Sequence, residues 1–243
     1  MKIFGLDISL DHGAVVTLNE DGLILDYIYL TSTKKFFDVD PSHSVLLSKR
    51  GKDESKDTFR LRRIDEVINA PIFLAVQGDA SSSYFSIEGY SYASQSTSIC
   101  QIAELTGYLK LLLFRGGGKI RIHAPTTVKQ FATGKGNASK KDVAVSALSN
   151  FDIPEGLIQR KTIKKKGKTK LPPESWWEDY DGPVTDIADA YFLARMLYTE
   201  LKLRSGGITL DKLSENERSQ FLRVTKTYPV NILARSFICK GEC

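Results

Sequence analysis

Four acidic residues occupy positions where a carboxylate could do chemistry. Asp7 lies inside an apolar stretch near the N-terminus, Glu88 ends another apolar stretch, and Asp186 and Asp189 open an expected helix. A buried carboxylate is costly unless something compensates its charge. Converging carboxylates are best compensated by a divalent cation, and Mg²⁺ prefers oxygen ligands. The pattern therefore predicts metal-dependent phosphodiester chemistry.

Each of these residues also has a purely structural interpretation. Asp186 and Asp189 are three residues apart, so they share one face of a first helical turn. Exposed backbone N–H groups favour acids there, and both could simply serve as caps. Asp7 could be a core carboxylate with a satisfied partner, and Glu88 alone is weak evidence because strand ends often carry an acid. The individual residues leave these alternatives open.

The elements expected to position these residues begin with three short strands at 3–9, 13–19 and 23–31. The turn around Gly22 is a hairpin signal, so the strands should form an antiparallel meander. Residues 32–56 look like a polar surface excursion. Further along we expect strands at 72–76, 84–88 and 120–123. We expect helices at 57–70 and 94–114, and a third that begins at Pro125. Two more helices are expected at 140–149, with Ser139 as N-cap, and at 185–203, with Thr185 as N-cap. This order predicts an α/β domain with a mixed sheet flanked by helices.

The domain is expected to span residues 1–203, with a basic insertion at about 152–184. Residues 204–243 would form a C-terminal extension with one helix. Ser214 and Glu217 have the spacing of a capping box at the start of that helix.

Charge is concentrated in one segment. The net charge is only +5, but residues 159–170 contain seven cations and no acid. Such a block is either a solvated loop or an element that binds a polyanion. We favour the second interpretation because the acidic residues predict a phosphodiester substrate.

Composition excludes a membrane protein. Hydrophobic residues make up 42% and charged residues 26%, which is ordinary for a globular domain. No apolar run approaches the roughly 20 residues that span a bilayer, and the N-terminus does not resemble an export signal. We expect an intracellular, cytoplasmic protein.

The acidic residues and their contexts together resemble a known family. The stretches GLDIS around Asp7, FSIEGYSY around Glu88, and DIADAYFLA at 186–194 resemble the RuvC-type Holliday junction resolvases of the RNase H-like superfamily. The segments 124–130 and 133–140 look like that family's P-x-x-V-K and T-G-x-G-x-A-x-K motifs. The resemblance covers about residues 2–203, and the additional segments are similar to those of viral or phage relatives, for which the compartment would be the host cytoplasm.

The resemblance implies an RNase H-like fold, in which the three-strand antiparallel meander is extended by parallel strands. It implies a homodimer that cuts four-way DNA junctions with two Mg²⁺ ions per active site, Mn²⁺ being a substitute. Asp7, Glu88, Asp186 and Asp189 would be the catalytic metal ligands. Lys140 is expected to contact DNA near the scissile phosphate, and Lys135 is a weaker candidate for that role. Tyr90 and Tyr92 would either stack on bases or be ordinary surface residues. Further phosphate contacts are expected from the lysines of the basic insertion, which are Lys161, Lys164, Lys165, Lys166 and Lys168.

Three alternatives remain. A different nuclease on the same fold could act on flaps, other branched DNA or RNA–DNA hybrids. A non-catalytic junction-binding scaffold is disfavoured because binding alone has no use for buried acids. An actin-like or sugar-kinase-like ATPase is disfavoured because no Gly-rich phosphate loop is evident. His12 could approach the site through the turn after the first strand, although the sequence favours a surface or turn histidine.

Overall fold

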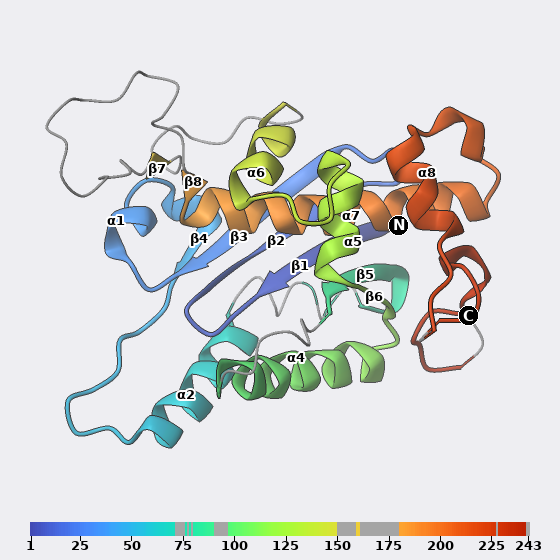
Figure 1. Ribbon diagram of the computed structural model, residues 1–243. Helices are drawn as coiled ribbons and strands as arrows, with labels where there is room; N and C mark the ends of the chain where they lie inside the picture. Colours follow the sequence, from blue (N-terminus) through green and yellow to red (C-terminus); the bar gives the residue numbers. More distant parts are fainter. Residues whose placement is uncertain are drawn as a thin grey trace, which may run out of the picture.

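The computed structural model describes residues 1–70, 76, 78, 80–89, 97–149, 159–160, 180–226 and 228–241. Its centre is a six-stranded mixed sheet in the order β4-β3-β2-β1-β5-β6 (Figure 1). The strands are β1 (Lys2–Ile8), β2 (His12–Leu18), β3 (Ile24–Thr31), β4 (Ser44–Leu46), β5 (Ser83–Glu88) and β6 (Lys119–His123). The first three strands are antiparallel, whereas β5 and β6 continue from β1 in parallel. The mixed α/β sheet expected from the sequence is confirmed.

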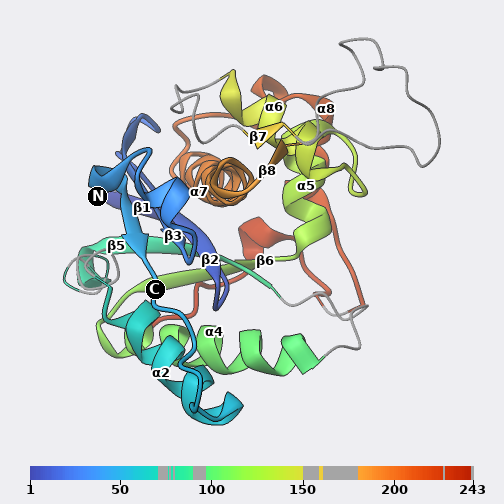
Figure 2. The same ribbon diagram turned by 90° about the vertical axis from the view of Figure 1, so that its left-hand side faces the viewer.

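Helices cover both faces of this sheet (Figure 2). On one face lie α5 (Pro125–Thr133), α6 (Lys140–Leu148) and the long α7 (Pro183–Arg204). On the other face lie α2 (Lys56–Ile68) and α4 (Thr97–Arg115). Alternate residues of a strand point to opposite faces. In β1, Ile3 therefore joins the apolar cluster under α7, and Leu6 joins the cluster over α2 and α4.

The sequence between β3 and α2 is more ordered than expected. It contains α1 (Lys34–Phe37), a 3₁₀ turn at Pro41–His43, and β4, which pairs in parallel with β3. Leu47 follows β4 and is fully buried against the α2 side of the sheet. The expected surface excursion is thus wrong in part, because one apolar residue in a polar stretch is enough to anchor an edge strand.

Several helix boundaries and faces were predicted correctly, and others were not. Ser139 caps α6 and forms a capping box with Asp142, as expected for the N-cap. The prediction that Thr185 caps α7 is wrong: the helix begins two residues earlier, at Pro183, after Gly182 as N-cap. Proline is well suited to the first helical position, and this signal outweighs threonine. The expected strand at 72–76 falls mostly outside the described residues.

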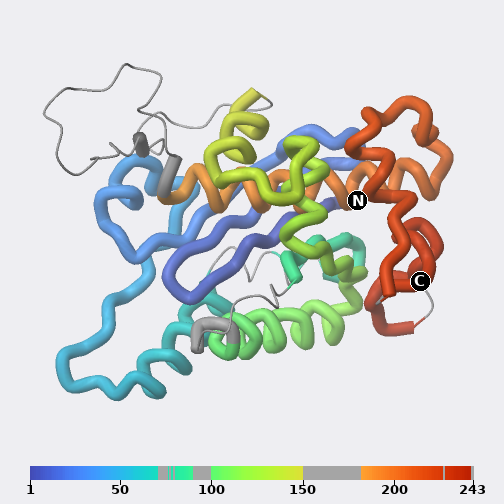
Figure 3. Tube along the Cα trace, in the orientation of Figure 1, coloured from blue at the N-terminus to red at the C-terminus, as the bar shows by residue number. Residues whose placement is uncertain are grey.

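The C-terminal extension packs onto the same core. It contains a 3₁₀ turn at Leu210–Lys212, α8 (Glu215–Leu222) and a second 3₁₀ turn at Ile232–Ala234. Phe221 is fully buried and meets Phe131 of α5 edge to face, with ring centroids 6.2 Å apart. Farther on, Ile238 forms an antiparallel bridge to Ile120 of β6. Figure 3 shows the extension passing from the end of α7 back to the β6 side of the sheet.

The contact between α7 and β1 depends on one glycine. A Cβ at Gly5 would overlap the carbonyl oxygen of Ala190 and lie 2.5 Å from the amide nitrogen of Ala194. Both atoms belong to the α7 backbone and cannot rotate away. Gly5 therefore sets the distance between the helix and the central strand.

We expect Gly5→Ala to destabilise the protein by about 3 kcal/mol, as overpacking a rigid contact does. Urea unfolding would measure the loss. Gly107→Ala is the matched control, because a Cβ there meets nothing within 4 Å. Gly107 lies inside α4, where alanine should stabilise by up to about 1 kcal/mol. Equal stability of Gly5→Ala and the parent protein would contradict this role for Gly5.

Candidate active site

Asp7 and Glu88 are brought together by strand pairing. The parallel register of β1 and β5 runs as far as Leu6 opposite Ile87, and each acid is the next residue in its strand. Leu6 and Ile87 both face the α2 and α4 side of the sheet. Because successive side chains alternate, both acids point toward the α7 side. Two carboxylates thus lie at the carboxyl ends of adjacent strands.

The first turns of α7 supply the other two carboxylates. Asp186 is 3% exposed, and Asp189 follows it by one turn in the same helix. The close approach of α7 to β1 at Gly5 brings this end of the helix over Asp7. The structure therefore joins all four sequence-predicted acids in one electrostatically coupled group.

Their mutual repulsion appears in their pKa values. Burial raises the pKa of Asp7 well above its usual range, and the charges of Asp186, Asp189 and Glu88 raise it further. Burial and the charge of Asp189 raise the pKa of Glu88 to about 7. Burial, and to a smaller extent Asp186, raise the pKa of Asp189 to about 6. The group holds more negative charge than the surrounding protein compensates.

Two lysines partly offset this charge. Lys140 opens α6, and its Nζ lies 3.9 Å from Oδ1 of Asp186. Lys129, from α5, lowers the pKa values of both Glu88 and Asp189, as Lys140 also does. Lys140 was predicted from the sequence. Lys129 was not predicted as a site residue, although it is the lysine of the P-x-x-V-K motif and could have been found from that motif.

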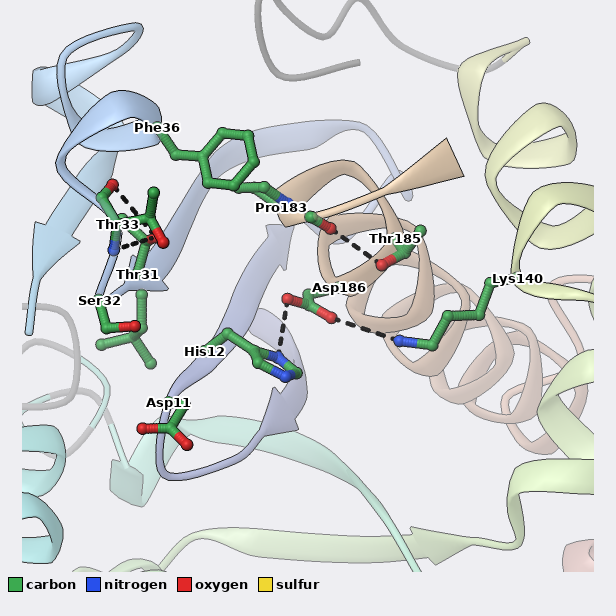
Figure 4. Close-up of a pocket in the computed structure, with 12 residues that line it drawn as sticks. Asp11, His12, Thr31, Ser32, Thr33, Phe36, Lys140, Pro183, Thr185 and Asp186 are labelled. Carbon is green, nitrogen blue, oxygen red and sulfur yellow. Dashed lines mark hydrogen bonds and ion pairs between the residues drawn. The ribbon is translucent and has the colours of Figure 1, made fainter. Parts of the chain in front are cut away.

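His12 is a further residue of this site. Its Nδ1 lies 3.0 Å from Oδ2 of Asp186 (Figure 4), and its side chain is 56% exposed. The hydrogen bond to Asp186 raises the pKa of His12 despite partial burial. The turn that carries His12 is held by the buried Arg63 of α2, which donates from Nη1 to the carbonyl oxygen of Leu10 at 2.9 Å. Of the two interpretations of His12, the structure supports the one that places it at the site.

An open cleft reaches the edge of the acidic group at Asp186. It has a volume of roughly 240 Å³, and its wall includes His12, Lys140 and Asp186 (Figure 4). The opposite wall comes from Thr33 and Phe36, around α1. One side of the cleft is therefore formed by residues of the segment 32–56, which was expected to be a surface excursion.

The donor chemistry suits a hard divalent cation, but the side-chain arrangement is incomplete. Among the described residues, no three His, Cys, Asp or Glu side chains are gathered closely enough to ligate one ion. Both oxygens of Asp186 are directed at cations, one at His12 and one at Lys140. A cation among the acids would relieve the repulsion that raises their pKa values, so the fit rests on charge and oxygen donors.

Of the remaining predicted DNA-binding residues, only Lys135 is described. Lys135 is exposed, and its charge makes a small contribution to the lowered pKa of Asp142, which hydrogen bonds from Ser139 chiefly cause. Tyr90 and Tyr92, together with the lysines predicted at 161–168, lie outside the described residues.

The sheet order and the acidic group place the candidate site at the carboxyl ends of β1 and β5. Residues 53–154 match the family model of the crossover junction endodeoxyribonuclease RuvC. This match confirms the resemblance to RuvC-type resolvases that the motifs indicate. It includes Glu88, Lys129 and Lys140, whereas Asp7 and the two α7 acids lie outside it.

Solved structures similar to this chain include two of RuvC. A Thermus thermophilus RuvC structure is 16% identical, with a TM-score of 0.47, and the alignment covers 85% of this chain and 97% of that one. T. thermophilus RuvC in complex with a Holliday junction substrate is 15% identical, with a TM-score of 0.48 and the same coverage. No curated protein sequence matches the chain. In the described residues, no helix is long and apolar enough to cross a bilayer.

The raised pKa values predict how stability depends on pH. A carboxyl whose pKa is raised by folding binds more protons in the native state, so its contribution is lost as pH rises through the folded pKa. For Glu88 that pKa is about 7. In EDTA, we expect the thermal midpoint to fall between about pH 5 and pH 8, and Glu88→Gln to reduce this fall.

The control for this experiment is Glu20→Gln, in an exposed turn. It should leave the pH dependence of the parent protein unchanged. If Glu88→Gln and Glu20→Gln behave alike, Glu88 does not belong to a repelling acidic group.

Proposed function

We propose that this protein is a metal-dependent, structure-selective endodeoxyribonuclease that resolves four-way DNA junctions. The observation that supports this most strongly is the coupled acidic group formed by β1, β5 and α7. Asp7 experiences the charges of all three other acids, and Lys129 and Lys140 face the group. Acids that a divalent cation would stabilise, flanked by lysines that suit phosphate, favour phosphodiester hydrolysis over binding alone.

In this proposal Asp7, Glu88, Asp186 and Asp189 hold two Mg²⁺ ions, for which Mn²⁺ can substitute. When bound, such ions activate a water molecule and stabilise the leaving oxygen. Three further residues bind the substrate or position the acids. Lys140 binds a phosphate next to the acids, and Lys129 supports it from α5. His12 orients Asp186 through Nδ1, and its raised pKa favours the protonated ring beside that carboxylate.

The choice of a four-way junction rests on the family resemblance. The family model that matches residues 53–154 is that of a crossover junction endodeoxyribonuclease. A homodimer with two such sites would cut paired strands of a junction symmetrically. The proposal includes Tyr90 and Tyr92 at the junction centre and Lys135 on a flanking phosphate.

Cleavage of an end-labelled four-way junction with Mg²⁺ tests this function. Linear duplex, splayed-arm and RNA–DNA hybrid substrates should run beside it, with EDTA controls. Paired, symmetric, metal-dependent nicks in the junction alone would support a resolvase. Cutting of the hybrid or splayed arm would assign a different nuclease activity to the same site, and tight junction binding without cleavage would assign a scaffold.

Asp7→Asn should abolish junction cleavage because it removes the central carboxylate of the group. Junction affinity should stay the same or improve, since one negative charge near the DNA backbone is lost. Gel-shift titration and the nicking assay measure the two effects separately. Asp211→Asn, an exposed substitution in the C-terminal extension, is the control and should cleave normally. Undiminished nicking by Asp7→Asn would rule out the site.

Lys161, Lys164, Lys165, Lys166 and Lys168 are proposed as phosphate contacts. Replacing one of them, as in Lys165→Gln, should weaken junction binding without changing sequence preference. It should also reduce the slope of log affinity against log salt by about one. Lys212→Gln, an exposed change in the C-terminal extension, provides the comparison. An unaltered slope in Lys165→Gln would identify that lysine as a solvated residue.

A further inference from the structure

A second cavity lies between β6, α5 and the C-terminal extension. Its volume is roughly 450 Å³, within the range of roughly 300–1,000 Å³ typical of small-molecule sites. Gly89, directly after Glu88, forms part of its rim, so it adjoins the acidic site without including the acids. Ile122, Met196 and Ile232 give it an apolar wall.

The charge lining this cavity has one sign. Lys110, Arg223 and Arg235 line it, and no Asp or Glu is among the described residues that do. Arg235 lies with its guanidinium 4.0 Å from the centre of the Tyr228 ring, so a cationic and an aromatic surface stand side by side. This lining suits a ligand that carries both negative charge and a flat ring.

The N-terminus of α5 also opens into this cavity. Ala124, its N-cap, and Thr126 both line the wall. Among the described residues no side chain caps the helix, and no acid lies in its first turn. The partial positive charge of that helix end is therefore uncompensated, and such an end binds phosphate readily.

Buried polar atoms without partners provide a separate indication of a ligand. Nε2 of His123 and Oε1 of Gln220 are buried and make no hydrogen bond to the part of the chain that the structure describes, and both residues line the cavity. His123 is 2% exposed and Gln220 is 4% exposed. Leaving such groups unsatisfied is costly, so a native structure normally gives them partners. The Gln220 oxygen accepts hydrogen bonds, which suits a base amine or a sugar hydroxyl.

We propose that this cavity binds a nucleotide, with its phosphate at the α5 N-terminus and near the cations Lys110, Arg223 and Arg235 that line the cavity. The base lies between the apolar wall and Tyr228, and a sugar or base donor reaches Gln220. The nucleotide is either free or the phosphorylated end of a DNA strand. This site is independent of the acidic group and does not require the proposed cleavage activity.

The test is calorimetric titration of the full-length protein in EDTA. The probes are deoxynucleoside 5′-monophosphates, inorganic phosphate, and a short oligonucleotide with or without a 5′-phosphate. We expect one nucleotide to bind per chain. Arg223→Gln should weaken binding about tenfold, the effect of losing one hydrogen bond to a charged group. Arg218→Gln is the matched control: it removes the same charge from exposed α8, outside this cavity, and should bind normally.

Thr126→Glu separates binding from folding. An acid in the first turn of α5 should preserve or raise stability through the helix dipole, yet repel the phosphate. Lower nucleotide affinity with an unchanged or higher thermal midpoint would support the proposal. Binding of the free monophosphate would identify a free nucleotide as the ligand. Binding of the 5′-phosphorylated oligonucleotide alone would identify a strand end.

Three results would overturn the proposal. The first is no binding of any probe. The second is equal affinity of the parent protein, Arg223→Gln and Thr126→Glu for every probe. The third is phosphate binding as tightly as the nucleotides, which would show an anion site that does not recognise a base.

Discussion

The site depends on how closely α7 can approach the central strand of the sheet. Gly5 has no side chain, so the backbone of α7 rests directly on β1 at Ala190 and Ala194. Asp186 lies about one turn before Ala190 and Asp189 directly precedes it, and Asp7 lies two residues beyond Gly5 on the same face of β1. A single steric condition therefore fixes the separation of acids that are about 180 residues apart in the chain. The parallel pairing of β1 with β5 then places Glu88 beside Asp7.

Bringing the four carboxylates together creates electrostatic repulsion that nearby cations offset only in part. Lys129 and Lys140 come from two different helices, α5 and α6, and each lowers the pKa of Glu88 and of Asp189. Even so, those pKa values stay above their ordinary range, since burial and mutual repulsion outweigh the lysines. The protein therefore preserves an unbalanced negative charge at one place, which a purely structural arrangement would remove. Perturbed acids of this kind concentrate at functional sites.

Much of the fold was predictable because its signals are local. The meander follows from alternating strands and from a glycine-containing turn, and Ser139 identifies the start of α6. Asp7, Glu88, Asp186 and Asp189 were found from residue type, context and the family resemblance. The strand β4 was missed because its stability comes from pairing with β3 and from burial of Leu47, neither of which a short polar stretch reveals.

Contacts between distant segments were the least predictable part of the site. The ion pair of His12 with Asp186 joins the β1–β2 turn to α7, and no periodicity or spacing specifies it. The sequence indicated Lys129 only as part of the P-x-x-V-K motif and did not show that it faces the acids. The second cavity needs β6, α5 and the C-terminal extension together, and the sequence did not specify what the extension packs against. Its attachment depends on Arg121, which pairs with Glu200 of α7 and donates to the carbonyl oxygens of Arg235 and Ser236.

That attachment also determines how the sheet ends. β6 is the last strand of the sheet, and an unprotected last strand offers free N–H and C=O groups to another chain. Ile120 and Ile238 exchange backbone hydrogen bonds of 2.9 and 3.0 Å, so part of that edge is already used within the molecule. Two copies could pair their sheets at this part of β6 only after the segment around Ile238 had been released. The C-terminal extension therefore blocks edge-to-edge pairing of two sheets at Ile120, and a homodimer that keeps this contact would form through a different surface.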